Sequence, residues 1–228
     1  TPCGTLFPYT TLFRSDLLNH MILPDLADAL SDGGRMTVER LMHDYYMRTA
    51  RINRLAERAV DRLTGNDDDG GREIATIPDM RISAREVRLT GEASDVLTRR
   101  PETAVRLFTV TGAQDLRISH DTAGDVEQWI VSDSVEIPSH PGIREAFQKL
   151  LSMPEGVGRT FRLMHAHGFL SALIPEFSEI AWHYQYDFYH TFTTDEHSIR
   201  VVENLEEMLH GSSRAMDLVG DIVPLVTA

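Results

Sequence analysis

The stretch TVERLMHDYYMRTARINRLAERAVDRL, residues 37–63, decides the fold class of this 228-residue chain. Its apolar residues recur at mostly helical spacing, and they are Val38, Leu41, Tyr45, Ile52, Leu55, Ala59 and Leu63. Arginine and glutamate residues fill many of the positions between them. The pattern predicts one amphipathic helix of about seven turns. Gly65 is expected to end it, and the polar run 66–71 predicts a loop rather than a calcium site.

Most of the remaining patterns are also helical. Four further stretches predict helices, namely residues 101–108, 124–131, 141–151 and 157–167. Gly168 is well placed to cap the last of these. Two short stretches, residues 74–77 and 85–89, predict the strands of a two-stranded ribbon. The predicted fold is therefore mostly α, with at most one small β ribbon.

A second informative stretch, HTFTTDEHSIRVV, begins at His190. Thr193 and Glu196 have the spacing of a capping box, so a helix is predicted to begin there and to end at Gly211. Its buried stripe is expected to consist of Ile199, Val202, Leu205 and Leu209. His197 lies at the edge of this stripe, so its side chain is expected to face a neighbouring helix rather than water.

Other polar residues near this helix have simpler expected roles. Asp195 and Glu196 lie in its first turn, where carboxylates stabilise the positive end of a helix. Three histidines show no pattern of partners and are expected at the surface or in packing: His165, His167 and His183. The apolar segment 216–226 predicts the start of another helix.

Composition excludes several classes of protein. The formal net charge of -13 argues against a broad electrostatic surface for nucleic acid or anionic lipid. No apolar run approaches the roughly 20 residues that span a bilayer. The lone cysteine, Cys3, cannot form an internal disulfide, which fits a reducing cytoplasm. No nucleic-acid partner and no membrane are therefore expected.

The first residues differ from the rest. The segment TPCGTLFPYTTLFRS, residues 1–15, has no helical or strand period that joins it to the residues after it, and there is no initiator methionine. It is similar to translated adapter or cloning sequence, so we expect it to be non-native and to pack poorly.

A set of residues in fixed order resembles a known family. They are Arg162-Leu-Met164, Gly168, Ile174-Pro-Glu-Phe177, Gln185, Asp187, Tyr189-His190 and Asp195-Glu-His197. The earlier segments 38–46 and 99–108 fit the same family, so the similarity extends over about residues 37–211. The family is that of the bifunctional uridylyltransferase/uridylyl-removing enzymes, which modify the PII nitrogen-signalling protein.

The resemblance implies a domain order. In such enzymes a nucleotidyltransferase domain uses UTP to attach UMP to PII. A helical linker comes next, then an HD domain that hydrolyses UMP off again, then two ACT domains that sense a ligand, glutamine. Residues 16–180 would be the linker, and 181–228 the truncated first part of the HD domain. The transferase motifs and the later His-Asp pair of the HD domain are not found in the sequence. A fragment without a complete catalytic site, inactive alone, is therefore expected.

The resemblance also implies a metal ligand. An HD hydrolase holds a divalent metal, magnesium or manganese, which activates water and neutralises charge on the phosphodiester. His197 matches the first histidine ligand, and His190 is a possible further participant. Without the resemblance, a structural histidine near a helix start would be the preferred interpretation of His197. One ligand cannot hold a catalytic metal, so none is expected to bind the fragment.

Two internal doublets could be mistaken for the missing metal pair. His43-Asp44 lies on the long predicted helix, and His120-Asp121 lies in an expected loop. Neither is expected to bind metal. Two other classes of function stay open, which are a stand-alone HD phosphohydrolase and a helical regulatory module without catalysis.

Overall fold

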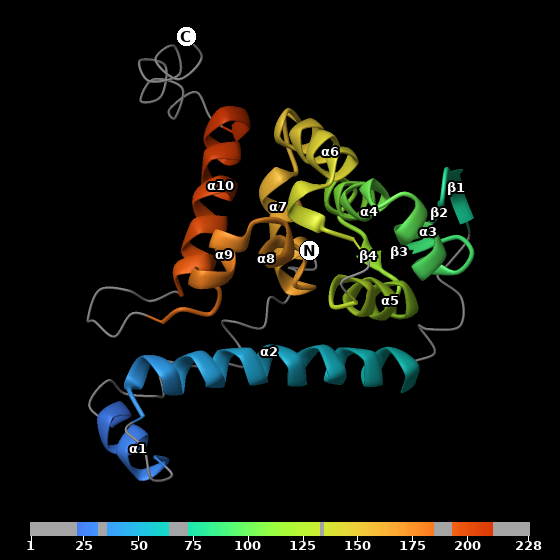
Figure 1. Ribbon diagram of the computed structural model, residues 1–228. Helices are drawn as coiled ribbons and strands as arrows, with labels where there is room; N and C mark the ends of the chain where they lie inside the picture. Colours follow the sequence, from blue (N-terminus) through green and yellow to red (C-terminus); the bar gives the residue numbers. More distant parts are fainter. Residues whose placement is uncertain (1–21, 32–35, 64–72, 133–134, 185–192, 212–228) are drawn as a thin grey trace.

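The computed structural model describes residues 22–31, 36–63, 73–132, 135–184 and 193–211, and most of them are helical (Figure 1). The helices are α1 (Leu23–Ala29), α2 (Val38–Leu63), α3 (Ala93–Arg99), α4 (Glu102–Ala113), α5 (His120–Ile130), α6 (Pro141–Leu151), α7 (Val157–Ala166), α8 (Phe169–Leu173), α9 (Pro175–Ile180) and α10 (Thr194–Gly211). A 3-10 turn, Ile137–Ser139, precedes α6. The predicted mostly α fold is confirmed. None of these helices combines the length and hydrophobicity that a membrane crossing requires.

The main core is built around α4. Its buried side chains include Leu107 and Phe108, and the Phe108 ring packs 5.3 Å from that of Phe169 in α8. Met164 from α7 and Ile143 from α6 complete the centre of the cluster. Fully burying an aliphatic or aromatic side chain of this size contributes about 1.5–3 kcal/mol, so this cluster holds the helical body together.

A small sheet lies at the edge of the body opposite α10 (Figure 1). Among the described residues it has the strand order β1 (Glu73–Ile77), β2 (Met80–Ser83), β3 (Glu86–Leu89) and β4 (Arg117–Ile118). The first three strands pair antiparallel, and β4 pairs parallel with β3. The two predicted strands are present as β1 and β3, but they do not pair with each other, because β2 lies between them. The sequence patterns missed β2, whose burial does not alternate along the strand, and β4, whose two residues are too few to show a period.

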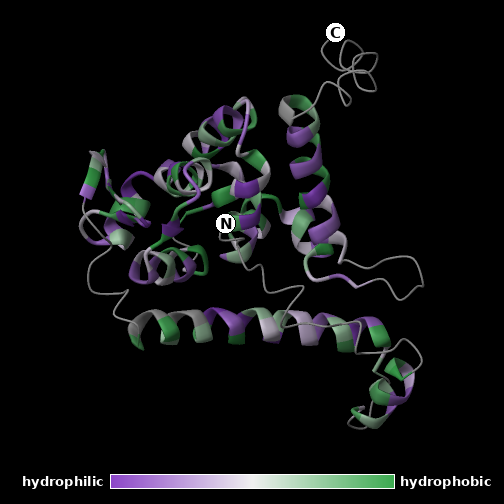
Figure 2. Cartoon of the chain, turned by 180° about the vertical axis from the view of Figure 1, so that it is seen from behind, coloured by the Kyte–Doolittle hydropathy of each residue, from purple (hydrophilic) through white to green (hydrophobic). Residues whose placement is uncertain are grey.

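The long predicted helix is confirmed as α2, but only part of its apolar face is buried. Near its start, Met42 and Tyr46 pack with residues of α1 and with Tyr184 in a second, smaller core. Further along, apolar residues that fit the same stripe are exposed, with Ile52 at 63%, Leu55 at 55% and Leu63 at 87%. Figure 2 shows hydrophobic and hydrophilic segments alternating along the whole of α2. The amphipathic pattern predicted the helix correctly and did not predict how much of it is covered.

Other sequence predictions hold with shifted boundaries. The helices predicted from residues 101, 141 and 157 are α4, α6 and α7, and Gly168 caps α7 with a φ of 76°. The helix predicted from residue 124 begins earlier, because the Ser119 side chain accepts a hydrogen bond from the Thr122 amide and caps it. His120 and Asp121, expected in a loop, are therefore the first residues of α5. The predictions for residues 1–15, 65–71 and 216–226 lie outside the described residues.

Gly112 provides a test of the contact between α4 and α7. A Cβ atom at Gly112 would lie 3.0 Å from Cα and 3.1 Å from N of Thr160, which are backbone atoms that cannot move without separating the helices. We expect Gly112→Ala to lower the free energy of unfolding by about 1–3 kcal/mol, measured by urea denaturation.

The matched control is Gly124→Ala in α5, where an added Cβ would meet nothing within 4 Å. Since glycine inside a helix is less favourable than alanine by about 0.5–1 kcal/mol, this variant should be neutral or slightly more stable. Equal urea midpoints for the two variants would show that α4 and α7 are not closely packed at Gly112.

Candidate functional site at the α7–α10 interface

Helices α7 and α10 pack antiparallel with little space between their backbones. At one end the Glu206 carboxylate accepts hydrogen bonds from the backbone amides of Val157 (2.6 Å) and Gly158 (3.0 Å). These amides belong to the first turn of α7, where a helix leaves its N–H groups unpaired. A Cβ atom at Gly158 would lie 3.0 Å from the backbone N of Glu203, so glycine permits the close approach.

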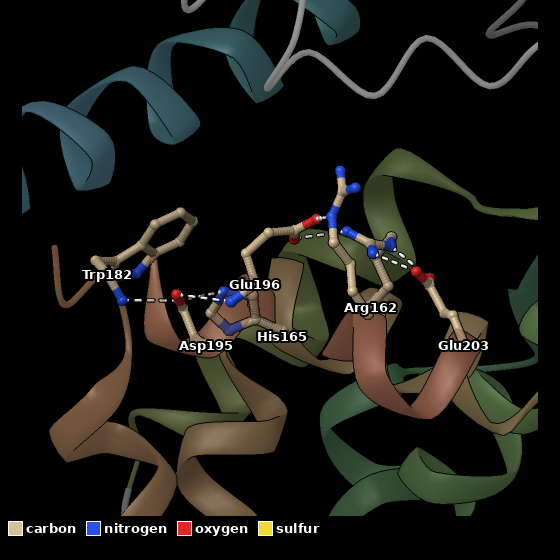
Figure 3. A network of polar contacts seen from close by, with 7 residues as sticks. Arg162, His165, Trp182, Asp195, Glu196 and Glu203 are labelled. Atoms are coloured by element: carbon tan, nitrogen blue, oxygen red, sulfur yellow. Dashed lines mark hydrogen bonds and ion pairs between the residues drawn. The ribbon is translucent and has the colours of Figure 1, made fainter. Parts of the chain in front are cut away.

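Arg162 of α7 connects two acidic residues of α10 (Figure 3). Its Nε and Nη2 atoms donate to the two carboxylate oxygens of Glu203, at 2.7 and 2.6 Å. Its Nη1 atom donates to Glu196 at 2.7 Å, and Arg200 donates to the other Glu196 oxygen at 2.7 Å. Arg162 is only 9% exposed and Glu196 5%, so these charges are largely removed from water. Burial disfavours the charged guanidinium, but its hydrogen bonds to Glu203 and Glu196 raise the pKa of Arg162 above its usual value.

His165, one turn further along α7, binds the first acidic residue of α10. Its Nε2 atom lies 2.9 Å from Oδ2 of Asp195, and the same oxygen accepts a hydrogen bond from the backbone amide of Trp182 at 2.7 Å (Figure 3). The His165 ring packs against the Trp182 ring with the centroids 4.9 Å apart. Asp195 is fully buried, which alone would raise the pKa of its carboxyl, but the contacts from His165, Thr193 and Trp182 hold that pKa below its usual range.

The helix predicted from the capping-box spacing of Thr193 and Glu196 is confirmed as α10, which ends at Gly211 as predicted. The Glu196 carboxylate has partners that the sequence did not predict, the guanidinium groups of Arg162 and Arg200. Asp195 does accept the Glu196 amide at 2.9 Å, as a residue at a helix start would, and it also pairs with His165. The sequence predicts His165 at the surface or in packing; its ring does pack against Trp182 and Phe177, and its pairing with Asp195 was not predicted. The basic residues of α7 and the acidic residues of α10 are visible in the sequence as opposite charges. That these two helix faces contact each other follows only from the structure.

His197 lies on a different face of α10 from its two neighbours. Asp195 and Glu196 are buried toward α7, whereas His197 is exposed. The expected contact of its side chain with a neighbouring helix is not found within the described part of the chain. Residues one, two and three turns further along on this side of α10 are also exposed, and they are Val201, Leu205 and Met208.

The predicted buried stripe of α10 is only half correct. Ile199 is buried and Val202 packs against the main core, as expected. Leu205 and Leu209 are exposed, because Glu203 and Glu206 occupy the positions toward α7 in that part of the helix. Two apolar faces are therefore present on α10, and one of them carries His197.

The other candidate metal residues stay apart. His43 and Asp44 lie together on α2, with 3.5 Å between Nδ1 and Oδ1, and His120 begins α5. His167 pairs with Glu127 at 2.9 Å. Over the described ranges, no group of three or more His, Cys, Asp or Glu side chains is placed to hold a metal ion. His190 lies outside the described residues.

Comparison with known proteins gives relatives of one name. The chain is 31% identical over 192 residues to the bifunctional uridylyltransferase/uridylyl-removing enzyme of Photobacterium profundum. The aligned region covers 81% of the chain and 22% of that protein. The chain is 25% identical over 236 residues to the protein of the same name from Caulobacter vibrioides, covering 96% of the chain and 25% of the relative. A Pseudoalteromonas translucida protein of this name is 40% identical over 70 residues, 31% of the chain and 8% of that relative. No family model matches, and no solved structure matches significantly.

Removal of Arg162 tests the buried charge network. Arg162→Met would leave the buried Glu196 and the partly buried Glu203 without this partner, and breaking a buried ion pair costs about 3–5 kcal/mol. We expect a loss of unfolding free energy of that size, measured by urea or thermal denaturation of the 228-residue chain.

Arg159→Met is the control on the same helix. Arg159 is about half exposed, its ion pair with Asp115 is long, at 3.7 Å, and its hydrogen bond to the Gly112 carbonyl is long as well, at 3.4 Å. Exposed pairs of this kind contribute about 0–1 kcal/mol, so the change should be small. If Arg159→Met and Arg162→Met lowered the unfolding free energy equally, the buried ion pairs of Arg162 would contribute no more to stability than an exposed pair.

Proposed function

Because the chain belongs to the family of bifunctional uridylyltransferase/uridylyl-removing enzymes, we propose that it carries the helical linker and the beginning of the HD hydrolase domain of such an enzyme. The chain spans about a fifth to a quarter of the length of the curated relatives, at 21–25%. The whole enzyme would attach UMP from UTP to the PII protein and remove it again in response to glutamine. It would act in the cytoplasm, which fits the single cysteine of the sequence.

The arrangement of Asp195, Glu196 and His197 is the observation that supports a metal site. The two carboxylates face α7 and are fully engaged in holding the helix, so neither is free to bind a metal. The imidazole of His197 is exposed on a face that also presents Val201 and Leu205. An apolar helix face of this kind is suited to packing against a further helix, and ligands on facing helices are how helical proteins build metal sites in their cores.

His197 fits such a site as one ligand and no more. Imidazole nitrogen is a ligand for divalent transition metals, and manganese or magnesium would also take carboxylate oxygens. We propose that the remaining ligands come from a helix that covers the His197 face of α10. The bound metal would supply a nucleophilic water and neutralise charge on the phosphodiester. In this proposal residues 16–180 form the linker, and residues from 181 onward lead into the hydrolase domain.

The test is His197→Ala in the full-length enzyme. We expect removal of UMP from modified PII to fall about a thousandfold, since loss of the metal removes several kcal/mol of transition-state stabilisation. Attachment of UMP should persist, because a separate domain would carry that chemistry. Both rates would be measured with purified PII.

The control is His183→Ala, which removes an exposed imidazole of the same kind only a short distance along the chain. It should leave both rates unchanged. If the His197→Ala enzyme removed UMP at the wild-type rate, the assignment of His197 as a metal ligand would be refuted. A regulatory module without catalysis would then be favoured.

A further inference from the structure

We propose that Arg162 and His165 of α7 are positioning residues for the hydrolase site, because they fix the rotation and the axial position of α10 and so aim His197. This inference rests on the proposed role of His197 as a ligand. It assigns a function in the hydrolase site to two residues of the helical linker, neither of which would touch the metal or the substrate.

The rotation of α10 is fixed by two contacts on one side. Arg162 binds both Glu196 and Glu203, which are two turns apart on α10 and so project from the same side of that helix. The contact to Glu203 uses two parallel N–H donors, which constrains direction as well as distance. Apolar packing alone is non-directional and would leave the helix freer to turn.

The axial position of α10 is fixed at both of its ends. Near the start of α10, Asp195 binds His165 and the Trp182 amide. Toward its end, Glu206 binds the first amides of α7. A shift of α10 along α7 by one turn, about 5.4 Å, would break both sets of contacts together. The antiparallel pair therefore has one register.

His197 directly follows Asp195 and Glu196 on α10. A rotation or shift of α10 that displaces these carboxylates therefore also displaces the His197 imidazole. A helix with its side chains has a radius of about 5–6 Å, so a rotation of about 15° would move a side-chain tip by about 1.5 Å. Metal and catalytic constellations require their ligands to within about 0.5 Å. Anchoring α10 on its α7 side thus matters for the chemistry proposed on its opposite, exposed side.

A purely structural role for Arg162 would have a different signature. Loss of stability alone lowers the amount of folded enzyme and leaves the metal dependence of the surviving molecules unchanged. A positioning role changes the metal concentration that the folded enzyme needs. The experiment therefore measures manganese binding to the full-length enzyme by calorimetry, and beside it the rate of UMP removal as a function of manganese concentration, well below the unfolding temperature.

Two mild variants are expected to keep the protein folded. Arg162→Lys retains the positive charge and loses the paired donors, and Glu203→Gln retains the shape and loses the charge of a partly exposed partner. Each should raise the manganese concentration for half-maximal UMP removal by about tenfold, in line with the effect of outer-shell residues on metal sites. Attachment of UMP should not change. The control Arg159→Met, on the exposed side of α7, should leave the manganese dependence as it is.

The outcomes separate this inference from the function on which it rests. A wild-type rate of UMP removal by the His197→Ala enzyme would refute the assignment of His197 as a metal ligand. If His197→Ala abolishes removal while both Arg162→Lys and Glu203→Gln keep the wild-type manganese dependence, only the positioning role is overturned. A shift shared by both variants and absent from Arg159→Met would support it.

Discussion

The buried guanidinium of Arg162 is the constraint on which the arrangement of α7 and α10 depends. Removing a charge from water is costly, and the cost is offset only when all nearby partners are in place. The three donors of Arg162 that meet Glu196 and Glu203 satisfy this condition in one orientation of α10. Joint replacement of Arg162, Glu196 and Glu203 by apolar residues of similar volume would hold the helices together with fewer restrictions on their angle and register, whereas loss of Arg162 alone leaves the buried carboxylates without their partner.

Sequence reasoning predicted the elements of this protein better than their contacts. Periodicity found α2 and α6, because the repeat of apolar residues along one helix is a local property. It did not reveal that Ile52 is exposed, since burial depends on a partner segment. The order of residues around Arg162 and Asp195 identified the family, which the relatives confirm. The pairing of His165 with Asp195 joins two segments that are far apart in the chain, and no pattern within either segment encodes it.

The position of α2 illustrates the same limit. It runs along one side of the body (Figure 1). Arg54 donates to the backbone carbonyl of Ala166 at the end of α7 and lies 3.6 Å from Glu127, which also binds His167. A polar link of this kind, rather than continuous apolar packing, joins the middle of α2 to the body. The amphipathic pattern of α2 therefore predicted its length and left its neighbours undetermined.

The capping of α7 by Glu206 has a consequence for the order of folding. Helix α7 has ten residues, and the residue at its N-cap is Gly156, which offers no side chain to cap it. An isolated helix of this length is marginal in water. The carboxylate that completes its first turn arrives from 49 residues further along the chain. Closing so long a loop costs entropy before the contact forms. The first turn of α7 should thus become fully protected from hydrogen exchange only in the same cooperative step that docks α10.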